Sequence, residues 1–337
     1  MFYVENSQTT YTSYVDMKQS KKESCQVILF GYNRPDLLKD RLNELIEIKP
    51  SNLLVSIDWF SVELIEEFTS MLEAYSNIWP ANCKFNYKLH DSNQGLARHL
   101  TETITRAFNE VSAVIVIEDD VSVSGDFVHN ATEILLDNSF IQEFSSIGGY
   151  SIVRIPKFLE KFNFFRNSIY FQCWGWGTRS DVWDLYRLDL QGIDIETNLS
   201  TSDSWNNLSR VQRQTWLGRF EKIQHKPIHT WDIQFQYLTF LMDKKQILPA
   251  GRLTENLGFG DKRGVHNKNL RPWWLGRSIH NNMPVKKHLK NDWIDAFFQR
   301  IESISLIGDS QKIIPLIKAL IKIIKGPARL ASLASRR

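Results

Sequence analysis

The feature that most limits the possible folds is an alternation, between residues 25 and 120, of short apolar runs with longer segments that carry apolar residues at helical spacing. The apolar runs are CQVILFG, NLLVSI, CKFNYKLH and AVIVIE, and the helical patterns between them cover residues 36–48, 61–77 and 96–111. Nearly continuous apolar strands joined by helices are typical of a parallel sheet that is covered on both faces. The sequence therefore predicts an α/β fold with a Rossmann-like, mainly parallel sheet and helices on both faces.

Polar side chains follow three of these four predicted strands. They are Asn33 and Arg34 after the first strand, Asp58 after the second, and Glu118 to Asp120 after the fourth. Parallel strands end at the same edge of a sheet, and the ligands of open α/β sheets bind beyond that edge. We therefore expect a small-molecule site there. The alternatives are a surface turn for Arg34 and a helix N-cap for Asp58.

The pattern changes near residue 145, where short aromatic-rich segments such as FNFFRNSIYFQCWGWGTRSDVW replace the regular alternation. This composition predicts loops, short strands and a few helices that complete a cleft. The glycines in CWGWG favour a loop whose indoles, Trp176 among them, stack on a ligand, and burial in the core is the alternative. The chain thus divides into a polar arm (1–24), a Rossmann-like half (25–145), an aromatic-rich half (146–290) and a helical basic tail (291–337).

The composition excludes several classes of function. The net charge is +3 from 41 basic and 38 acidic residues, so the chain has no general field that attracts nucleic acid. The three cysteines lie far apart and lack CxxC spacing, so we expect neither disulfides nor a structural zinc site. The sequence has no signal-like apolar segment and no run of about 18 apolar residues, and we expect a cytoplasmic protein.

The segment from 311 to 337 has apolar residues at helical spacing, seven lysines and arginines, and no acid. A basic amphipathic helix commonly lies on an anionic membrane surface, and this favours peripheral binding at the inner face of a membrane. In the alternative, the apolar stripe of the helix packs on the rest of the protein and its lysines face water.

The strand AVIVIE runs directly into Glu118, Asp119 and Asp120. Adjacent carboxylates repel each other and are costly to bury, so this acidic triplet requires either open solvent or a cation that offsets the charge. Mg²⁺ and Mn²⁺ are usually held by one or two carboxylates together with substrate phosphates. The triplet therefore favours a divalent metal that holds a diphosphate, and a solvated acidic turn is the alternative.

Seven segments occur in an order that resembles the motifs of GT-A glycosyltransferases. They are VILFGYNRPDLLKDRL, VSID, NQGLARHL, VIVIEDDVSVSGDF, WGWGTRSDVW, HTWDIQF and LGFGDKRGVHN, and they span roughly residues 25–270. The chain is most similar to the inverting N-acetylglucosaminyltransferase I type and to related bacterial sugar transferases of the family 2 kind. This resemblance implies a GT-A fold in which residues 25–145 bind a nucleotide sugar, while residues 146–290 bind the acceptor and carry the catalytic base.

The resemblance also implies roles for individual residues. Asp120, the last acid of the EDD motif, is expected to contact the metal, Mn²⁺ or Mg²⁺, and Asp232 of the Trp-Asp element is expected to be the catalytic base. The residues expected to contact the nucleotide-sugar donor are Arg34, Asp58, His99, Glu118, Asp119, Trp176, Gly260 and His266. Without the resemblance, His99 is more typical of a packed histidine and Asp232 of an N-cap.

The expected activity is that of a metal-dependent inverting glycosyltransferase. It moves a sugar from a nucleotide diphosphate sugar, with UDP favoured, to a hydroxyl of a glycan or glycolipid in surface polysaccharide or lipopolysaccharide assembly. A nucleotidyltransferase acting on sugar phosphates is the nearest alternative, although FGYNRPD has one glycine where such enzymes usually carry a Gly-rich phosphate loop. A non-catalytic glycan-binding module on a transferase scaffold is the second alternative.

Overall fold

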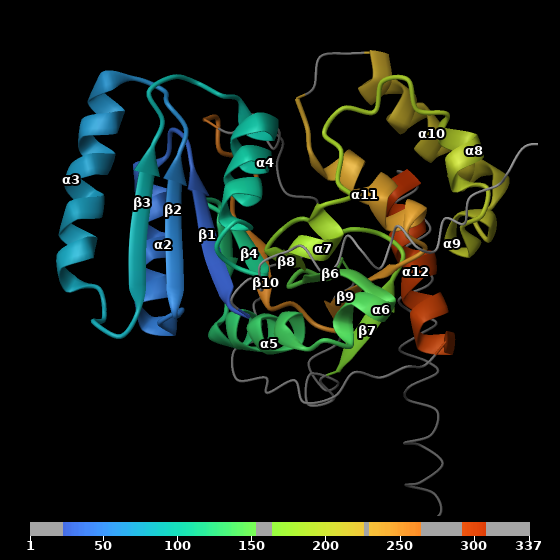
Figure 1. Cartoon of the computed structure of the whole chain (residues 1–337), viewed down its shortest axis with the longest axis horizontal. Helices are drawn as coiled ribbons and strands as arrows, with labels where there is room; N and C mark the ends of the chain where they lie inside the picture. The colour runs from blue at the N-terminus through green and yellow to red at the C-terminus, as the bar shows by residue number, and fades with distance from the viewer. Residues whose placement is uncertain (1–22, 153–163, 226–228, 264–291, 308–337) are drawn as a thin grey trace, which may run out of the picture.

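The computed structural model describes residues 23–152, 164–225, 229–263 and 292–307. The Rossmann-like half lies at the left of Figure 1 and the aromatic-rich half at the right. The arm up to residue 22, His266 and the basic segment 311–337 lie outside the described residues.

In the described part of the chain, one main sheet of eight strands runs through both halves in the order β3-β2-β1-β4-β8-β6-β9-β7. The strands are β1 (Cys25–Gly31), β2 (Asn52–Ile57), β3 (Lys84–Leu89), β4 (Ala113–Glu118), β6 (Phe144–Gly148), β7 (Phe165–Ser168), β8 (Trp176–Arg179) and β9 (Lys245–Pro249). The first four strands pair in parallel, as the sequence predicts, whereas β7 and β8 run antiparallel to their neighbours. Because β4 lies between β1 and β8, it joins the two halves.

Helices cover both faces of this sheet, which confirms the predicted α/β architecture. The helices are α2 (Pro35–Ile48), α3 (Val62–Ile78), α4 (Leu96–Ala107), α5 (Gly125–Leu136), α6 (Phe140–Glu143), α7 (Ser180–Trp183), α8 (Ile195–Leu199), α9 (Asp203–Asn206), α10 (Arg210–His225), α11 (Asp232–Leu241) and α12 (Asp292–Ile307). Within the described ranges, none of them combines the length and apolar content that a bilayer span needs.

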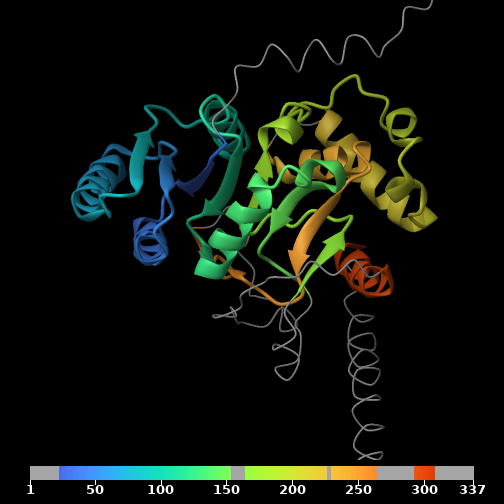
Figure 2. The ribbon, with the colours of Figure 1, turned by 60° about the horizontal axis from the view of Figure 1, so that its bottom comes forward.

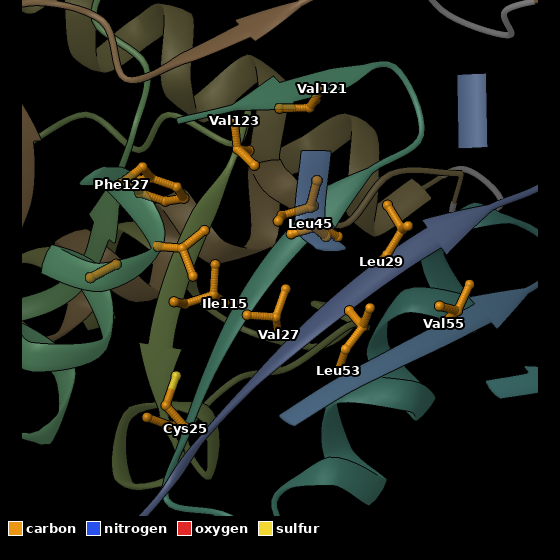
Figure 3. Close-up of a cluster of buried hydrophobic side chains, with 14 of the residues drawn as sticks. Cys25, Val27, Leu29, Leu45, Leu53, Val55, Ile115, Val121, Val123 and Phe127 are labelled. Atoms are coloured by element: carbon orange, nitrogen blue, oxygen red, sulfur yellow. The ribbon is translucent and has the colours of Figure 1, made fainter. Parts of the chain in front are cut away.

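Alternate side chains of β1 enter two different apolar cores. Val27 and Leu29 pack with α2, α3 and α5, and Figure 3 shows Val27 beside Ile115 of β4. Ile28 and Phe30 point to the other face, where they pack with α4 and α11. A strand that is buried on both faces needs an apolar residue at nearly every position, so polar residues at its end stand out.

Local sequence signals set the helix ends near the carboxyl edge of the sheet. Pro35 takes the first position of α2, where its missing N–H is not needed, and Asp36 lies in the first turn. Ser61 caps α3 because its hydroxyl accepts a hydrogen bond from the Leu64 amide. Since Ser61 is the cap, the N-cap alternative for Asp58 is wrong.

Helix α12, red in Figure 1 and Figure 2, packs on the edge strand β7. The Arg166 side chain of β7 and the Glu302 side chain of α12 form an ion pair that is fully buried. Glu302 also accepts a hydrogen bond from the Ser168 hydroxyl, and Asp295 accepts one from the Asn167 amide. Residues 292–307, which the sequence assigned to the tail, are therefore held in the aromatic-rich half.

Candidate functional site

The acidic triplet lies at the carboxyl end of β4, beside the loop that follows β1. In the parallel pairing of these strands, Phe30 lies opposite Glu118, so both chains leave the sheet at the same edge. The strand order reverses at this point, because β2 and β3 extend from β1 while the later strands extend from β4. Ligands of such sheets bind in the crevice at the reversal. Asp119 and Asp120 are nevertheless buried, with 3% and 8% of their surfaces exposed.

Arg34 supplies the positive charge that the buried acids require. Its Nε and Nη2 donate hydrogen bonds to the two carboxylate oxygens of Asp119, and its Nη1 lies 3.0 Å from Asp120 Oδ2. Burial lowers the pKa of Arg34, but the charges of the two acids more than offset this effect, so the guanidinium stays charged. The structure thus brings Arg34, Asp119 and Asp120 into one cluster.

Glu118 is partly buried and lies in a negatively charged environment. Burial, followed by the charges of Asp120 and Asp119, raises the pKa of Glu118 to about 8. The charge of Asp232 adds to this shift. Asp232, at the start of α11, therefore lies within electrostatic range of the triplet at the end of β4.

The backbone next to Asp232 is held firmly at the start of α11. The Thr230 hydroxyl donates a hydrogen bond to the Asp232 carboxylate, which is partly exposed. The Tyr186 hydroxyl donates to the Trp231 carbonyl oxygen at 3.0 Å. The Gln234 side-chain amide donates to the Thr230 carbonyl oxygen at 2.7 Å. A partly exposed carboxylate on a fixed segment suits the transfer of a proton from a bound hydroxyl.

The Cys173 thiol lies within electrostatic range of both Asp232 and the triplet. Burial raises the pKa of Cys173 well above its usual value, and the charges of Asp232, Glu118 and Asp120 add to the shift. The sequence did not single out this cysteine, because it has no CxxC partner.

Gly258 lies directly against the Asp120 carboxylate. A Cβ added at Gly258 would lie 2.2 Å from Asp120 Oδ2, so glycine leaves the room that the carboxylate occupies. The contact arises because β10 (Thr254–Asn256) pairs with β5 (Val121–Val123), which directly follows the triplet. The Leu257 amide also donates to the Asp120 carbonyl oxygen at 2.6 Å. The neighbour of this glycine in the structure is thus the acid expected to contact the metal.

Glu44 of α2, which the sequence did not single out, fixes β5. Its carboxylate accepts hydrogen bonds from the Ser122 hydroxyl at 2.7 Å and from the Val123 amide at 3.2 Å. It also pairs with the buried Arg41 at 2.7 Å. These contacts tie the strand after the triplet to the helix that begins beside Arg34. An Arg-Glu pair three residues apart on a helix is too common to have indicated this role.

The segment 257–263 reaches the start of α2. Arg263 donates two hydrogen bonds to the Asp36 carboxylate, at 2.6 and 3.0 Å. Gly260 has a φ of 83°, a conformation that favours glycine. The roles of Gly260 and His266 in closing over a donor stay predictions, and His266 lies outside the described residues.

Asp58, at the end of β2, organises the loop that precedes α4. One of its carboxylate oxygens accepts the Trp59 and Gln94 amides at 2.9 and 2.8 Å, and the other accepts the Gly95 amide at 3.0 Å. Only 3% of the residue is exposed. Asp58 therefore positions this loop at the edge of the sheet, and its contact with a nucleotide stays a prediction.

His99 is a packed histidine of α4. Its Nε2 lies 2.7 Å from Ser56 Oγ of β2, and its ring packs edge-on against Phe30 of β1. Burial, assisted by the charges of His90 and Lys88, lowers the pKa of His99 to about 3, so the ring is neutral. The ring therefore supports the ends of β1 and β2, and its contact with a donor stays a prediction.

The structure also corrects the role expected for Trp176. This residue begins β8, is fully buried and stacks on Trp231 with the ring centroids 5.0 Å apart, so it cannot stack on a ligand. Gly175, with a φ of 72°, separates it from Trp174. Trp174 is partly exposed and packs edge-on against Phe259 of the segment 257–263. The indole at the edge of the site is therefore that of Trp174.

The acids at the end of β4 fit a divalent cation when a diphosphate completes the ligand set. Their burial beside Arg34 shows that a positive charge is needed at this position. Across the described ranges, no three His, Cys, Asp or Glu side chains cluster as a metal site. Mg²⁺ and Mn²⁺ commonly take one or two protein carboxylates and complete their shell with phosphate oxygens and water. Asp120 would be the protein ligand in such a site.

Comparisons with known proteins give a limited result. The chain matches no protein-family model and no curated protein sequence. Solved structures with some similarity include a mannosyltransferase from Pyrobaculum calidifontis in complex with GDP-Man and Mn²⁺, which is 12% identical over 69% of this chain and 76% of its own, with a TM-score of 0.39. A UDP-glucose pyrophosphorylase complexed with UDP-glucose is 12% identical over 69% of this chain and 94% of its own, with a TM-score of 0.36.

A third similar structure is 4-diphosphocytidyl-2C-methyl-D-erythritol synthase from Anaerococcus prevotii. It is 8% identical over 64% of this chain and 95% of its own, with a TM-score of 0.31. All three proteins are enzymes, and two were solved with a nucleotide sugar bound. Scores this low assign no activity to this chain, and its α/β architecture stands on its own strand order.

Proposed function

We propose that the protein is a metal-dependent inverting glycosyltransferase of the GT-A type that uses a nucleotide diphosphate sugar. The observation that supports this most is the cluster at the end of β4, where Arg34 compensates the buried Asp119 and Asp120 and Asp232 lies within electrostatic range. This cluster offers a guanidinium for phosphate, acids for a metal and a separate carboxylate for a proton. The motif order supports UDP as the nucleotide and a glycan or glycolipid hydroxyl as the acceptor.

The proposed reaction is a single displacement. The acceptor hydroxyl oxygen forms a bond to the anomeric carbon, and the bond from that carbon to the diphosphate oxygen breaks, which inverts the carbon. Asp232 takes the proton of the attacking hydroxyl, and the nucleoside diphosphate leaves with the electron pair of the broken bond. A divalent metal at Asp120 would neutralise charge on the leaving diphosphate. Gly258 and Glu44 keep Asp120 and the strand after it in place.

The first experiment is a donor screen with the purified protein. Release of nucleoside diphosphate is measured from UDP-, GDP- and dTDP-sugars, and nucleotide release from CMP-sugars, with Mn²⁺ or EDTA, for the wild type and Asp120→Ala. Metal-dependent release of nucleoside diphosphate from one donor, lost in the variant, supports the proposal. Release of pyrophosphate would instead identify a nucleotidyltransferase. Glycan binding without turnover, unchanged by Asp232→Asn, would identify a binding module.

We propose in addition that the protein works at the inner face of a membrane in surface polysaccharide or lipopolysaccharide assembly. The basic amphipathic pattern of residues 311–337 supports this setting. Co-sedimentation with anionic and neutral liposomes tests it, with a chain that ends at residue 307 as the control. Equal behaviour of the two chains on anionic liposomes would contradict membrane binding through this segment.

A further inference from the structure

The ion pairs of Arg34 use three of the five N–H groups of its guanidinium. Nε and Nη2 are bound to Asp119, and Nη1 is bound to Asp120. The side chains of Arg34, Asp119 and Asp120 are 11%, 4% and 11% exposed, so water screens these contacts little. Breaking one side of a buried ion pair leaves an uncompensated charge. The pair can therefore open only if each partner receives another ligand of opposite charge.

A metal at Asp120 must compete with contacts that already surround one carboxylate oxygen. Arg34 Nη1 lies 3.0 Å from Oδ2, and the backbone of Gly258 packs against the same atom. Mg²⁺ binds oxygen at about 2.0–2.1 Å, and a cation at that distance would be repelled by the guanidinium beside it. A divalent metal without a partner for Arg34 should therefore bind weakly.

We propose that Arg34 is an exchangeable counter-ion. In the free protein it compensates Asp119 and Asp120. When a nucleoside diphosphate binds, Nη1 of the guanidinium moves from Asp120 to the phosphate oxygens, Nε and Nη2 stay on Asp119, and a divalent metal takes the Asp120 carboxylate. This inference rests on the proposed function, because it requires a diphosphate ligand. Arginine suits the exchange because its planar guanidinium matches carboxylate and phosphate oxygen pairs equally well.

The exchange has a thermodynamic consequence. Each ligand removes the obstacle to the other, so metal and diphosphate bind with positive coupling. Linkage requires that the diphosphate raises the metal affinity by the same factor as the metal raises the diphosphate affinity. An uncharged side chain at position 34 should remove the repulsion between the guanidinium and the metal. It should therefore also remove much of the coupling between metal binding and diphosphate binding.

Arg263 provides a matched control for Arg34. It also pairs with two acids, Asp36 and Asp261, and it lies on the segment 257–263 that reaches α2. The Arg263 and Asp36 side chains are 43% and 58% exposed, so water screens this pair and the acids of the triplet are not among its partners. Removing the Arg263 charge should therefore leave the metal affinity of the triplet unchanged.

The test measures Mn²⁺ binding to the full chain from the electron paramagnetic resonance signal of free Mn²⁺, with and without UDP, and subtracts the Mn²⁺ that UDP binds in matched samples without protein. In the wild type, UDP should raise the Mn²⁺ affinity by about tenfold or more. Arg34→Met should bind Mn²⁺ alone about tenfold more tightly than the wild type, and UDP should add less than about threefold. Arg263→Met should behave as the wild type does.

Two results would overturn the exchange: no effect of UDP on the Mn²⁺ affinity of the wild type, or no gain in Mn²⁺ affinity in Arg34→Met. The first comparison needs no variant, so it can overturn the exchange even if Arg34→Met does not fold. If the wild type neither binds a nucleoside diphosphate nor turns over any donor, the proposed function itself fails. Donor turnover without the expected Mn²⁺ pattern overturns the role of Arg34 alone.

Discussion

Gly258→Ala tests how strictly the Asp120 carboxylate must stay where the structure places it. The added Cβ would lie 2.2 Å from Asp120 Oδ2, and real Cβ atoms essentially never approach closer than 3.0 Å. The carboxylate must therefore move by roughly 1 Å, away from Gly258. Gly258 does not have a positive φ, so alanine can take its place without backbone strain. A change in donor turnover can therefore be assigned to the displaced Asp120 carboxylate.

A misplacement of about 1 Å at a reacting centre costs about 100-fold in rate, so donor turnover should fall by about that factor. The free energy of unfolding should fall by only about 1 kcal/mol, because the obstructing atoms are the end of a side chain. Turnover is measured as released nucleoside diphosphate, and stability by urea unfolding. Gly218→Ala is the control: nothing lies within 4 Å of its added Cβ, and alanine in α10 should stabilise by about 0.5–1 kcal/mol without changing turnover. If Gly258→Ala kept turnover within about threefold of the wild type, the placement of Asp120 would not matter as reasoned.

Three further predictions follow from the site. Asp232→Asn should lower kcat by about 10²–10⁴-fold and leave the affinity for UDP unchanged, because the carboxylate takes the proton and does not hold the nucleotide. Steady-state kinetics measure kcat, and calorimetry measures the affinity for UDP. An unchanged kcat would show that Asp232 is not the base. Asp58→Ala should lower the free energy of unfolding by about 2–3 kcal/mol, because three backbone amides lose a charged acceptor. A loss below about 1 kcal/mol in urea unfolding would count against this. Folding lowers the pKa of His99 to about 3, so between about pH 3 and pH 6.5 the unfolded chain holds a proton that the folded chain does not. The contribution of the neutral His99 ring to the free energy of unfolding is therefore complete above about pH 6.5, and it falls by about 1.4 kcal/mol for each pH unit below that. Urea unfolding at pH 7 and pH 5 should show a smaller loss for His99→Gln than for the wild type, and equal losses would contradict the buried neutral ring.

The parallel half of the fold was predictable because its signals are local. β1, β2 and β4 coincide with the apolar runs, since strands buried on both faces carry apolar residues at nearly every position. The acidic triplet was visible for the same reason, because three carboxylates cannot continue such a strand. Its pairing with Arg34 also follows from topology, because neighbouring parallel strands end at one edge.

The error at Trp176 comes from contacts between distant parts of the chain. Which tryptophan of CWGWG is buried depends on where β8 begins, and that is set by its antiparallel pairing with β4. The N-cap alternative for Asp58 failed for a similar reason, because two of its partners are amides at Gln94 and Gly95, on the loop before α4. The contact of Gly258 with Asp120 was not predictable either, because the sequence does not show that β10 brings the two together.

The buried pair of Arg166 and Glu302 determines where this protein can be shortened. A chain cut at residue 291, the boundary that composition suggests, would lose all of α12, and with it the acid that pairs with Arg166 and the buried side chains of Phe298 and Ile301. Burial of two large apolar side chains contributes about 1.5–3 kcal/mol each, which is a large part of the stability of an ordinary domain, so such a chain should fail to fold. A chain that ends after Ile307 keeps the pair. The basic segment 311–337 can therefore be removed on its own, and any change in location or activity can then be assigned to that segment instead of to a damaged fold.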